Sequence, residues 1–323
     1  MRRFLSYLAR VLISAALLYL VARKIPLHSF LHSLSQVNLP LMVVSYFLIP
    51  VMGYIDANRT KMMSDLQGLT LSINQIVRIG FVTSFYSLFL PGYLAAGVIR
   101  WHRMARQDKK PAQAFAIIVF TRLLSTIVTA LVGLGCWLLD PTARRNLGFG
   151  AGFGLLLLAL CVVYWLFFTR GRAHWLAEWL VRRRWVPRLA ADKVGKVLRS
   201  VDAFGSLSTA KLLSTLALLV GSELIGILSF YLISVAMHLG LAAVSIGWVR
   251  AYVTLITLLP ISIMGLGVRD GSMVVMLRTY GVAPSLAVTY SVLLLTRTVV
   301  LGLLGGACEL WNVMRFRLTA AQS

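Results

Sequence analysis

IIVFTRLLSTIVTALVGLGCWLL, residues 117–139, contains a single charged side chain, Arg122. LGFGAGFGLLLLALCVVYWLFF, residues 147–168, contains none. A run of about 20 apolar residues is long enough to cross the hydrocarbon core of a bilayer as a helix. These two runs therefore predict membrane-spanning helices.

The composition of the whole chain also indicates a membrane protein. Hydrophobic residues make up 59% of the 323 residues and charged residues 13%, about half the charged fraction of a typical soluble domain. The ten-residue alternation of an outer-membrane β-barrel is missing from the sequence. The net charge of +22 does not indicate a nucleic-acid partner, because Lys and Arg collect in the cytoplasmic loops of membrane proteins. We expect an all-α integral membrane protein with a single polytopic domain over residues 1–323.

The apolar runs predict about six full transmembrane helices. They are expected at residues 4–22, 39–55, 113–138, 148–168, 212–236 and 283–307. The first run imitates a signal peptide but has no small-residue cleavage site, so we interpret it as an uncleaved helix.

Two further apolar segments, residues 74–98 and 247–268, are interrupted by a proline that is followed by glycine, which ends a helix and allows a sharp turn. If residues 74–98 crossed fully, the basic cluster Arg100–Lys110 would lie outside the cell, against the positive-inside rule. We therefore predict two re-entrant hairpins, with both chain termini in the cytoplasm. The expected turn residues are Pro91, Gly92, Pro260, Gly265 and Gly267.

The two hairpins have matching sequence surroundings. Pro91 precedes Arg100 by nine residues, and Pro260 precedes Arg269 by nine. Further along, Thr121-Arg122-Leu123 in one long span matches Thr296-Arg297-Thr298 in another. We predict two repeat units, residues 74–140 and 245–312, that enter the membrane from opposite sides. Such inverted repeats place a substrate site between the halves of many transporters.

The basic loop at residues 169–210 interleaves arginine and lysine with tryptophan. This pattern favours a cytoplasmic pair of amphipathic helices that lies on anionic lipid headgroups.

Three charged residues are expected inside spans: Arg122, Arg297 and Glu223. A charge at bilayer depth usually faces a partner or a polar cavity. Glu223 paired with one arginine would be a structural ion pair, whereas all three together would form a polar route. One carboxylate cannot neutralise two arginines, so a positive charge remains that suits an anion such as a lipid phosphate.

Arg100 and Arg269 lie one hairpin arm beyond their turns. Nine helical residues rise about 13 Å, roughly the distance from the midplane to the headgroups. Each arginine alone is typical of a membrane boundary. As an inverted pair, they are candidate headgroup contacts in opposite leaflets.

Signatures of other classes are missing from the sequence. It has no P-loop for ATP, no close carboxylate pair and no histidine ligand spacing, so we predict no cofactor and no metal. The three cysteines show no pairing pattern and are expected as small core residues. They are Cys136, Cys161 and Cys308.

Two stretches resemble the motifs of a known family. LPGYLAAGVIRW, residues 90–101, resembles the LPGxxGGDVVR motif, and LPISIMGLGVRDG, residues 259–271, resembles LPISxGGLGVREG. Both motifs belong to the lysylphosphatidylglycerol synthase transmembrane region, also called the flippase-like domain family, and Arg122 matches an arginine that recurs after the first motif. The resemblance implies a bacterial or archaeal inner-membrane protein. Members move aminoacylated phosphatidylglycerol between leaflets or accompany glycosyltransferases that act on polyprenyl-linked sugars or cell-wall lipids.

The sequence departs from these motifs at two places. Ala95-Ala96 replaces glycine, and no acidic residue is found near Val98, while Asp270 stands where Glu is usual. The more positive first motif favours a plain anionic or polyprenyl-phosphate lipid over a cationic aminoacyl headgroup. Since no soluble aminoacyl-transfer domain follows, we do not expect this chain alone to synthesise lysyl-lipid.

The predicted function is translocation of an anionic phospholipid or polyprenyl-phosphate-linked lipid through a basic groove, and a cell-envelope glycosyltransferase or synthase is a candidate partner. One alternative is a membrane enzyme, or enzyme subunit, that transfers a sugar or acyl group on a lipid carrier. Another is a scaffold that anchors a synthase through the loop 169–210. The predicted substrate-binding residues are Arg100, Arg122, Arg269, Arg297 and Glu223.

Overall fold

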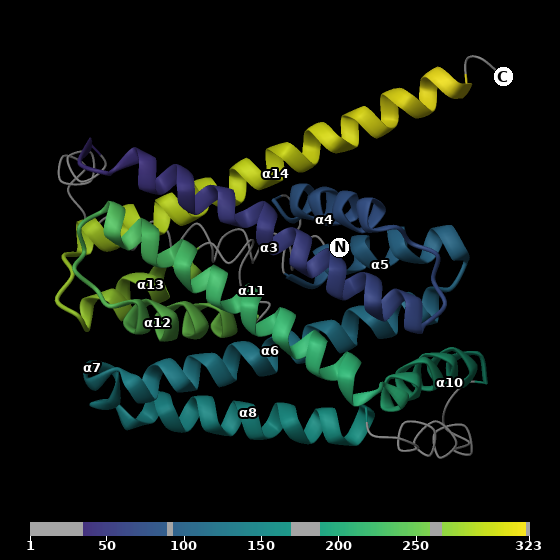
Figure 1. Ribbon diagram of the computed structural model, residues 1–323, viewed down its shortest axis with the longest axis horizontal. Helices are drawn as coiled ribbons and strands as arrows, with labels where there is room; N and C mark the ends of the chain where they lie inside the picture. The colour runs from purple at the N-terminus through teal and green to yellow at the C-terminus, as the bar shows by residue number, and fades with distance from the viewer. Residues whose placement is uncertain (1–34, 89–92, 169–187, 259–266, 321–323) are drawn as a thin grey trace, which may run out of the picture.

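The computed structural model describes four parts of the chain, residues 35–88, 93–168, 188–258 and 267–320, and every regular element in them is helical (Figure 1). This confirms the predicted all-α membrane class. Five helices are long and apolar enough to cross a membrane. Their bounds are α3 Leu39–Leu66, α6 Pro111–Leu139, α8 Leu147–Phe168, α11 Thr209–Ala236 and α14 Pro284–Ala320, whose candidate span lies within Pro284–Glu309. They correspond to five of the six predicted spans, and the sixth, residues 4–22, lies outside the described residues.

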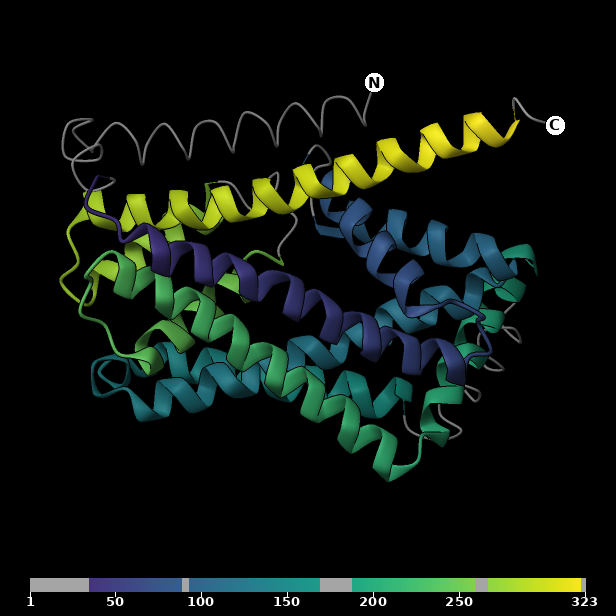
Figure 2. The same cartoon turned by 45° about the horizontal axis from the view of Figure 1, so that its top comes forward.

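Four shorter helices cover the described parts of the two predicted broken segments and the residues that follow them. They are α4 Ile73–Ser87, α5 Tyr93–Asp108, α12 Ala243–Ile256 and α13 Val268–Arg278. The 15 residues of α4 rise only about 22 Å, less than the roughly 30 Å of a hydrocarbon core. The pair α4–α5 lies in one half of the molecule and the pair α12–α13 in the other (Figures 1 and 2). Of the predicted turn residues only Gly267, with φ 80°, falls within the described residues.

Three small elements complete the described chain: α7 Pro141–Arg144, α10 Arg188–Asp202 and the 3₁₀ helix η1 Ala203–Ser206. From α10 and η1, the side chains of Leu198, Val201 and Phe204 are buried, and α10 packs on α6 and α8. Phe204 stacks on Phe120 of α6 with a 4.1 Å centroid separation. The apolar face of α10 therefore contacts protein, where the sequence had predicted a membrane surface.

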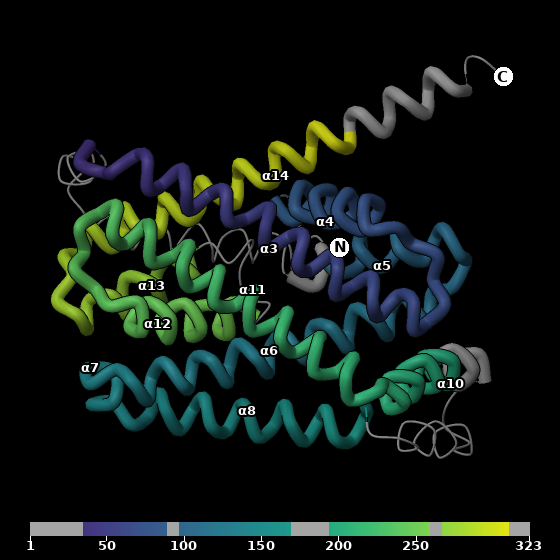
Figure 3. The backbone as a smooth tube through the Cα atoms, viewed as in Figure 1, coloured from purple at the N-terminus to yellow at the C-terminus, as the bar shows by residue number. Residues whose placement is uncertain are grey.

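Each short helix pair packs on a long helix that belongs to the other half of the chain, an arrangement we call exchanged packing. α4 packs on α14, while α12 packs on α6, and α3 and α11 lie side by side at the centre (Figure 3). Glycine permits both exchanged contacts. A Cβ on Gly305 of α14 would lie 2.0 Å from the Phe81 carbonyl oxygen of α4, and one on Gly247 of α12 would lie 2.6 Å from Cys136 Sγ of α6.

The two halves also begin and end corresponding helices alike. α3 is followed by Gly68 with φ 68° and α11 by Gly240 with φ 66°, a backbone region that glycine adopts without strain. α6 begins at Pro111 and α14 at Pro284, and proline favours the first helical position because it lacks an N–H.

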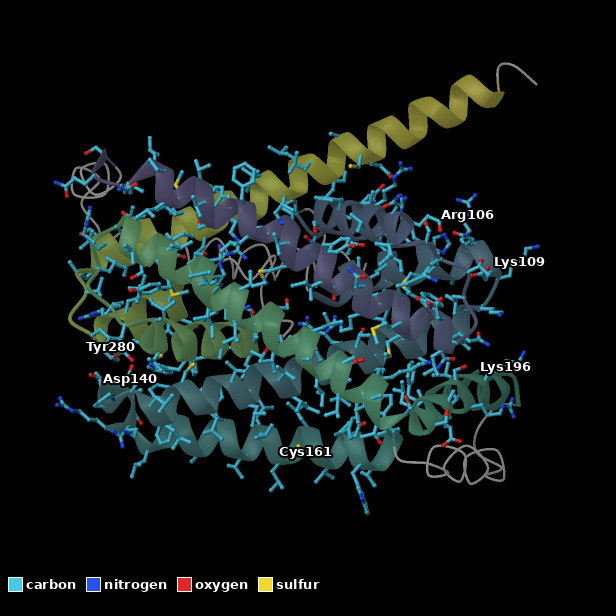
Figure 4. The ribbon with its side chains drawn as sticks, in the orientation of Figure 1. Arg106, Lys109, Asp140, Cys161, Lys196 and Tyr280 are labelled. Atoms are coloured by element: carbon cyan, nitrogen blue, oxygen red, sulfur yellow. The ribbon has the colours of Figure 1, made fainter. Side chains whose placement is uncertain are left out.

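The surface that remains is apolar over the outer helices. On α8, Leu155, Leu158 and Trp165 are all more than half exposed, as expected of a helix against lipid. Cys161 on α8 is also exposed, so its assignment as a core residue was wrong (Figure 4). An apolar environment in a membrane protein can be lipid instead of protein, which is why hydrophobicity alone misplaced it.

Candidate functional site

A first set of charged side chains gathers around Asp56 of α3. Arg100 of α5 donates from Nη2 to Asp56 Oδ2 at 2.8 Å and to Thr60 Oγ1 at 2.8 Å. Arg59, one turn after Asp56, donates to the other carboxylate oxygen. The residues Asp56, Arg59 and Thr60 lie at i, i+3 and i+4, so they share one face of α3. One carboxylate thus serves two arginines.

Arg59 is only 8% exposed, and its Nε has no hydrogen-bond partner among the described residues. Arg122 of α6 is half-buried and lies close enough to Arg59 for electrostatic repulsion. We call Asp56, Arg59, Arg100 and Arg122 the first charged group. These four side chains, three arginines and one carboxylate, together carry a net positive charge.

A second set gathers around Glu223 of α11, which is 8% exposed. Arg250 of α12 donates from Nη1 to Glu223 Oε2 at 2.5 Å, and the Thr129 hydroxyl of α6 donates to Oε1 at 2.5 Å. Gly226, one turn after Glu223, leaves the room for this arginine, because a Cβ there would lie 2.5 Å from Arg250 Nη2.

Arg250 is 9% exposed and lies in the second turn of α12. The sequence left Arg122 and Arg297 as the candidate ion-pair partners of Glu223, whereas the partner in the structure is Arg250. The pairing joins two different helices, so spacing along the chain did not reveal it.

Arg297 of α14 lies beside this ion pair. Its Nη1 donates to Ser229 Oγ at 2.8 Å, and its guanidinium lies 5.3 Å from the centre of the Phe230 ring. The guanidinium of Arg250 lies 5.5 Å from the same ring. A cation is attracted to an aromatic face at such distances, so Phe230 stabilises two like charges near each other.

Arg269 is the second residue of α13 and pairs with its neighbour Asp270 at 3.0 Å. Asp270 is 7% exposed, accepts from the backbone N–H of Gly267 at 3.2 Å and also accepts from the Ser291 hydroxyl of α14. Asp270 therefore fixes the start of α13, and Arg269 lies within electrostatic range of Arg297. We call Glu223, Arg250, Arg269 and Arg297 the second charged group.

Corresponding helices supply the residues of the two charged groups. Each takes a carboxylate from one of the two central helices, α3 or α11. Each also takes one arginine from the second helix of a short pair, Arg100 or Arg269, and one from a long helix, Arg122 or Arg297. The structure thus divides the five predicted residues between two groups, and the Thr129–Glu223 hydrogen bond joins a helix of one to the carboxylate of the other.

Sequence reasoning missed Asp56, Arg59 and Arg250. A usable signal existed for the first two, since a carboxylate followed three residues later by arginine, directly after an apolar run, indicates one polar helix face. Among the described residues, no three His, Cys, Asp or Glu side chains come close enough to hold a metal ion.

A separate polar network closes the end of the bundle at which α7 lies. Tyr280 donates to Asp140 Oδ2 at 2.5 Å and accepts from the Trp248 indole, while Asp140 also accepts from the backbone N–H of Thr142 at 2.9 Å (Figure 4). Burial by itself would raise the pKa of Asp140, but the hydrogen bonds from Tyr280, Ser245 and the start of α7 hold that pKa below its ordinary value. Burial raises the pKa of Tyr280, and the adjacent Asp140 raises it further.

These features define a class: a multi-pass α-helical membrane protein whose bundle contains two groups of buried and half-buried arginines with carboxylates. The family model of the lysylphosphatidylglycerol synthase TM region matches residues 7–306, and the chain belongs to that family. The family is a membrane domain associated with lipid modification or flipping, so membrane lipids are the expected partners. Neither the search among curated proteins nor the search among solved structures found a match.

Proposed function

We propose that this protein translocates an anionic phospholipid or a polyprenyl-phosphate-linked lipid across the cytoplasmic membrane, along a basic groove between the two charged groups. The observation that supports it most is the first charged group, where Asp56 pairs with Arg59 and Arg100 and a third arginine, Arg122, lies near Arg59 inside an apolar bundle. Arginine at this depth has a free-energy cost of a few kcal/mol or more, so a functional reason for retaining it is expected. A phosphate supplies the missing negative charge.

The carboxylates serve as counter-ions when no lipid is bound. Asp56 forms an ion pair with Arg100, and Glu223 forms one with Arg250, so both arginines have a counter-ion within the bundle. A lipid phosphate then exchanges with Asp56 at the arginines of the first charged group. Exchange between two anions costs less than creating and filling an uncompensated positive site.

The route follows the corresponding arginines. Arg100 contacts the phosphate at the cytoplasmic leaflet, Arg122 and Arg297 contact it near the midplane, and Arg269 contacts it at the outer leaflet. We assign the α10 end of the bundle to the cytoplasm because the basic residues that follow α5 and those of α10 lie there.

The proposed inverted repeat is consistent with this route. The exchanged packing of α4 on α14 and α12 on α6, together with the matched helix ends, is what two inverted units would produce. We propose that the repeat also includes α3 and α11, since each contributes the carboxylate of its group. Inverted units give a substrate two similar sites, one open to each side in turn.

The experiment measures lipid crossing in proteoliposomes. Fluorescent phosphatidylglycerol is incorporated, and a membrane-impermeant quencher reports how fast lipid from the inner leaflet reaches the outer one. The unmutated protein is compared with Arg122→Gln/Arg297→Gln, and with Arg144→Gln/Arg145→Gln as the charge-matched control. Arg144 and Arg145 are exposed at the α7 end and contribute to neither charged group.

We expect crossing with the unmutated protein and the control, and at least a ten-fold slower rate with the double variant. Fluorescent phosphatidylcholine should cross more slowly than phosphatidylglycerol because it has no net charge. If the double variant is folded and moves lipid at the unmutated rate, the arginine route is wrong. If no anionic phospholipid or polyprenyl phosphate crosses with any of the proteins, translocation is wrong and an enzyme subunit takes its place.

A further inference from the structure

A cavity of about 610 Å³ opens at the α10 end of the bundle, away from both charged groups. Its walls come from the end of α3, the link between α5 and α6, and α10. Four basic side chains line it: Lys109, Lys110, Lys196 and Arg199. Figure 4 shows Lys109 and Lys196 at this same end of the molecule.

The charge of the cavity is one-sided. Among the described residues that line it, none is acidic. The neighbouring Asp108 is bonded elsewhere, because its carboxylate accepts from the Thr70 hydroxyl at 2.6 Å and the Thr70 N–H at 2.8 Å. Those two hydrogen bonds lower the pKa of Asp108 and keep it directed at Thr70.

The walls are fixed by hydrogen bonds that, among the described residues, engage only one of the four cations, Lys110. Gln67 donates to the Ser200 carbonyl at 2.6 Å, which ties α10 to the end of α3, and Lys110 donates to the Gly68 carbonyl at 2.7 Å. The side chains of Lys109, Lys196 and Arg199 are exposed. Lys109 has φ 52°, in a backbone region that residues other than glycine rarely adopt.

The backbone adds to the same charge. α6 begins at Pro111 without a side-chain cap, and its first residues Ala112 and Gln113 line the cavity. A helix start carries a partial positive charge, which here reinforces the four cations of the cavity walls.

We propose that this cavity is a binding site for a phosphate group with two or more negative charges, a phosphomonoester or a diphosphate. Its volume lies in the range of small-molecule sites, about 300–1,000 Å³. The three exposed cations carry three positive charges, more than is needed to neutralise the single negative charge of a phosphodiester lipid. The group is borne either by a membrane lipid, such as phosphatidate, or by a soluble molecule. This site is separate from the translocation route and does not rest on it.

The test uses the full chain in nanodiscs of neutral phosphatidylcholine, with inorganic pyrophosphate as the probe and calorimetry as the readout. The variant Lys109→Gln/Lys196→Gln/Arg199→Gln removes the three exposed cations and retains Lys110 and its bond to Gly68. The control Arg144→Gln/Arg145→Gln/Arg278→Gln removes three exposed arginines elsewhere on the surface. Thermal unfolding confirms that both variants are folded.

We expect saturable pyrophosphate binding to the unmutated protein and the control, and at least ten-fold weaker binding to the cavity variant. A second set of nanodiscs contains phosphatidate. If phosphatidate weakens pyrophosphate binding to the unmutated protein, the lipid headgroup reaches the cavity, and if it does not, the site serves a soluble phosphate. Absence of saturable binding to the unmutated protein, or equal loss in the cavity variant and the control, overturns the proposal.

Discussion

Ser64 of α3 and Ser234 of α11 accept the same kind of backbone hydrogen bond, from the residue five positions later. The carbonyl of Ser64 accepts from the N–H of Leu69 at 2.8 Å, and that of Ser234 accepts from the N–H of Leu239 at 3.0 Å. Both serines are buried, and neither hydroxyl has a hydrogen-bond partner among the described residues. This correspondence between the two central helices supports the proposed repeat.

Replacing either serine with alanine should not destabilise the protein. A buried hydroxyl without a partner has a desolvation cost of about 1–3 kcal/mol, which Ser64→Ala or Ser234→Ala removes. We expect an unchanged or higher unfolding temperature in detergent. Ser229→Ala is the control, since Ser229 donates to the Ser45 carbonyl at 2.9 Å and accepts from Arg297. A clear loss of stability in both test variants would show that these hydroxyls bind a lipid or water.

Glu223→Gln should be strongly destabilising because it leaves Arg250 buried without its counter-ion. Breaking a buried pair by removing one partner costs about 3–5 kcal/mol. The double variant Glu223→Gln/Arg250→Gln should recover part of that loss. Unfolding temperatures of the two single variants and the double variant form the cycle. Additive losses in the double variant would mean that the two residues do not interact.

Gly305→Ala should weaken the contact between α14 and α4. The new Cβ would lie 2.0 Å from the backbone oxygen of Phe81, and a backbone atom cannot move aside as a side chain can. Overpacking of this kind costs about 1–3 kcal/mol. The control is Gly221→Ala in α11, where a Cβ meets no atom within 4 Å among the described residues. Equal unfolding temperatures for both variants would argue against the close α4–α14 approach.

Tyr280→Phe should make the protein less stable at neutral pH, and the difference should shrink in acid. Asp140 has a lowered pKa in the folded protein, so its contribution is present above the unfolded pKa of about 3.9 and is lost as the pH falls through the folded value. The variant lacks one hydrogen bond that lowers the pKa of Asp140, so Asp140 contributes less stability at neutral pH and the variant loses less of it in acid.

Unfolding temperatures of the Tyr280→Phe variant and the unmutated protein at about pH 7, 4 and 2.5 check this expectation. Tyr46→Phe is the control, because Tyr46 donates to the Leu293 carbonyl, which does not titrate. A deficit of Tyr280→Phe that stays constant with pH would contradict the assignment of Asp140 as the titrating group.

The sequence predicted the helical class and five described spans because lipid selects for long apolar runs. It placed the end of one span at residue 55, whereas α3 continues to Leu66. Asp56, Arg59 and Thr60 are polar but contact other helices. Hydrophobicity measures only how well a side chain suits lipid, so these residues ended the predicted span too early. Hydrophobicity also gave no sign of Arg250 as a site residue, because its burial depends on Glu223 in another helix.

The candidate site was located in part. Arg122 and Arg297 were identified because a charge within an apolar run is rare, and Arg100 and Arg269 because each lies nine residues after a proline. Their carboxylate and aromatic neighbours could not be found in this way. Asp56 meets Arg100 across 44 residues, and Phe230 meets Arg297 only because α11 and α14 approach each other.

The exchanged packing of the long helices has a consequence for biogenesis. α6 needs α12 as its neighbour, and α14 needs α4, so the first half of the chain enters the membrane with an interface that only later residues complete. During synthesis the ribosome adds about 5–20 residues per second, and through that interval the nascent half depends on lipid or an insertion chaperone to cover Gly133 and Cys136. A chain truncated after α8 should therefore be degraded by membrane proteases and should not accumulate as a stable half-protein.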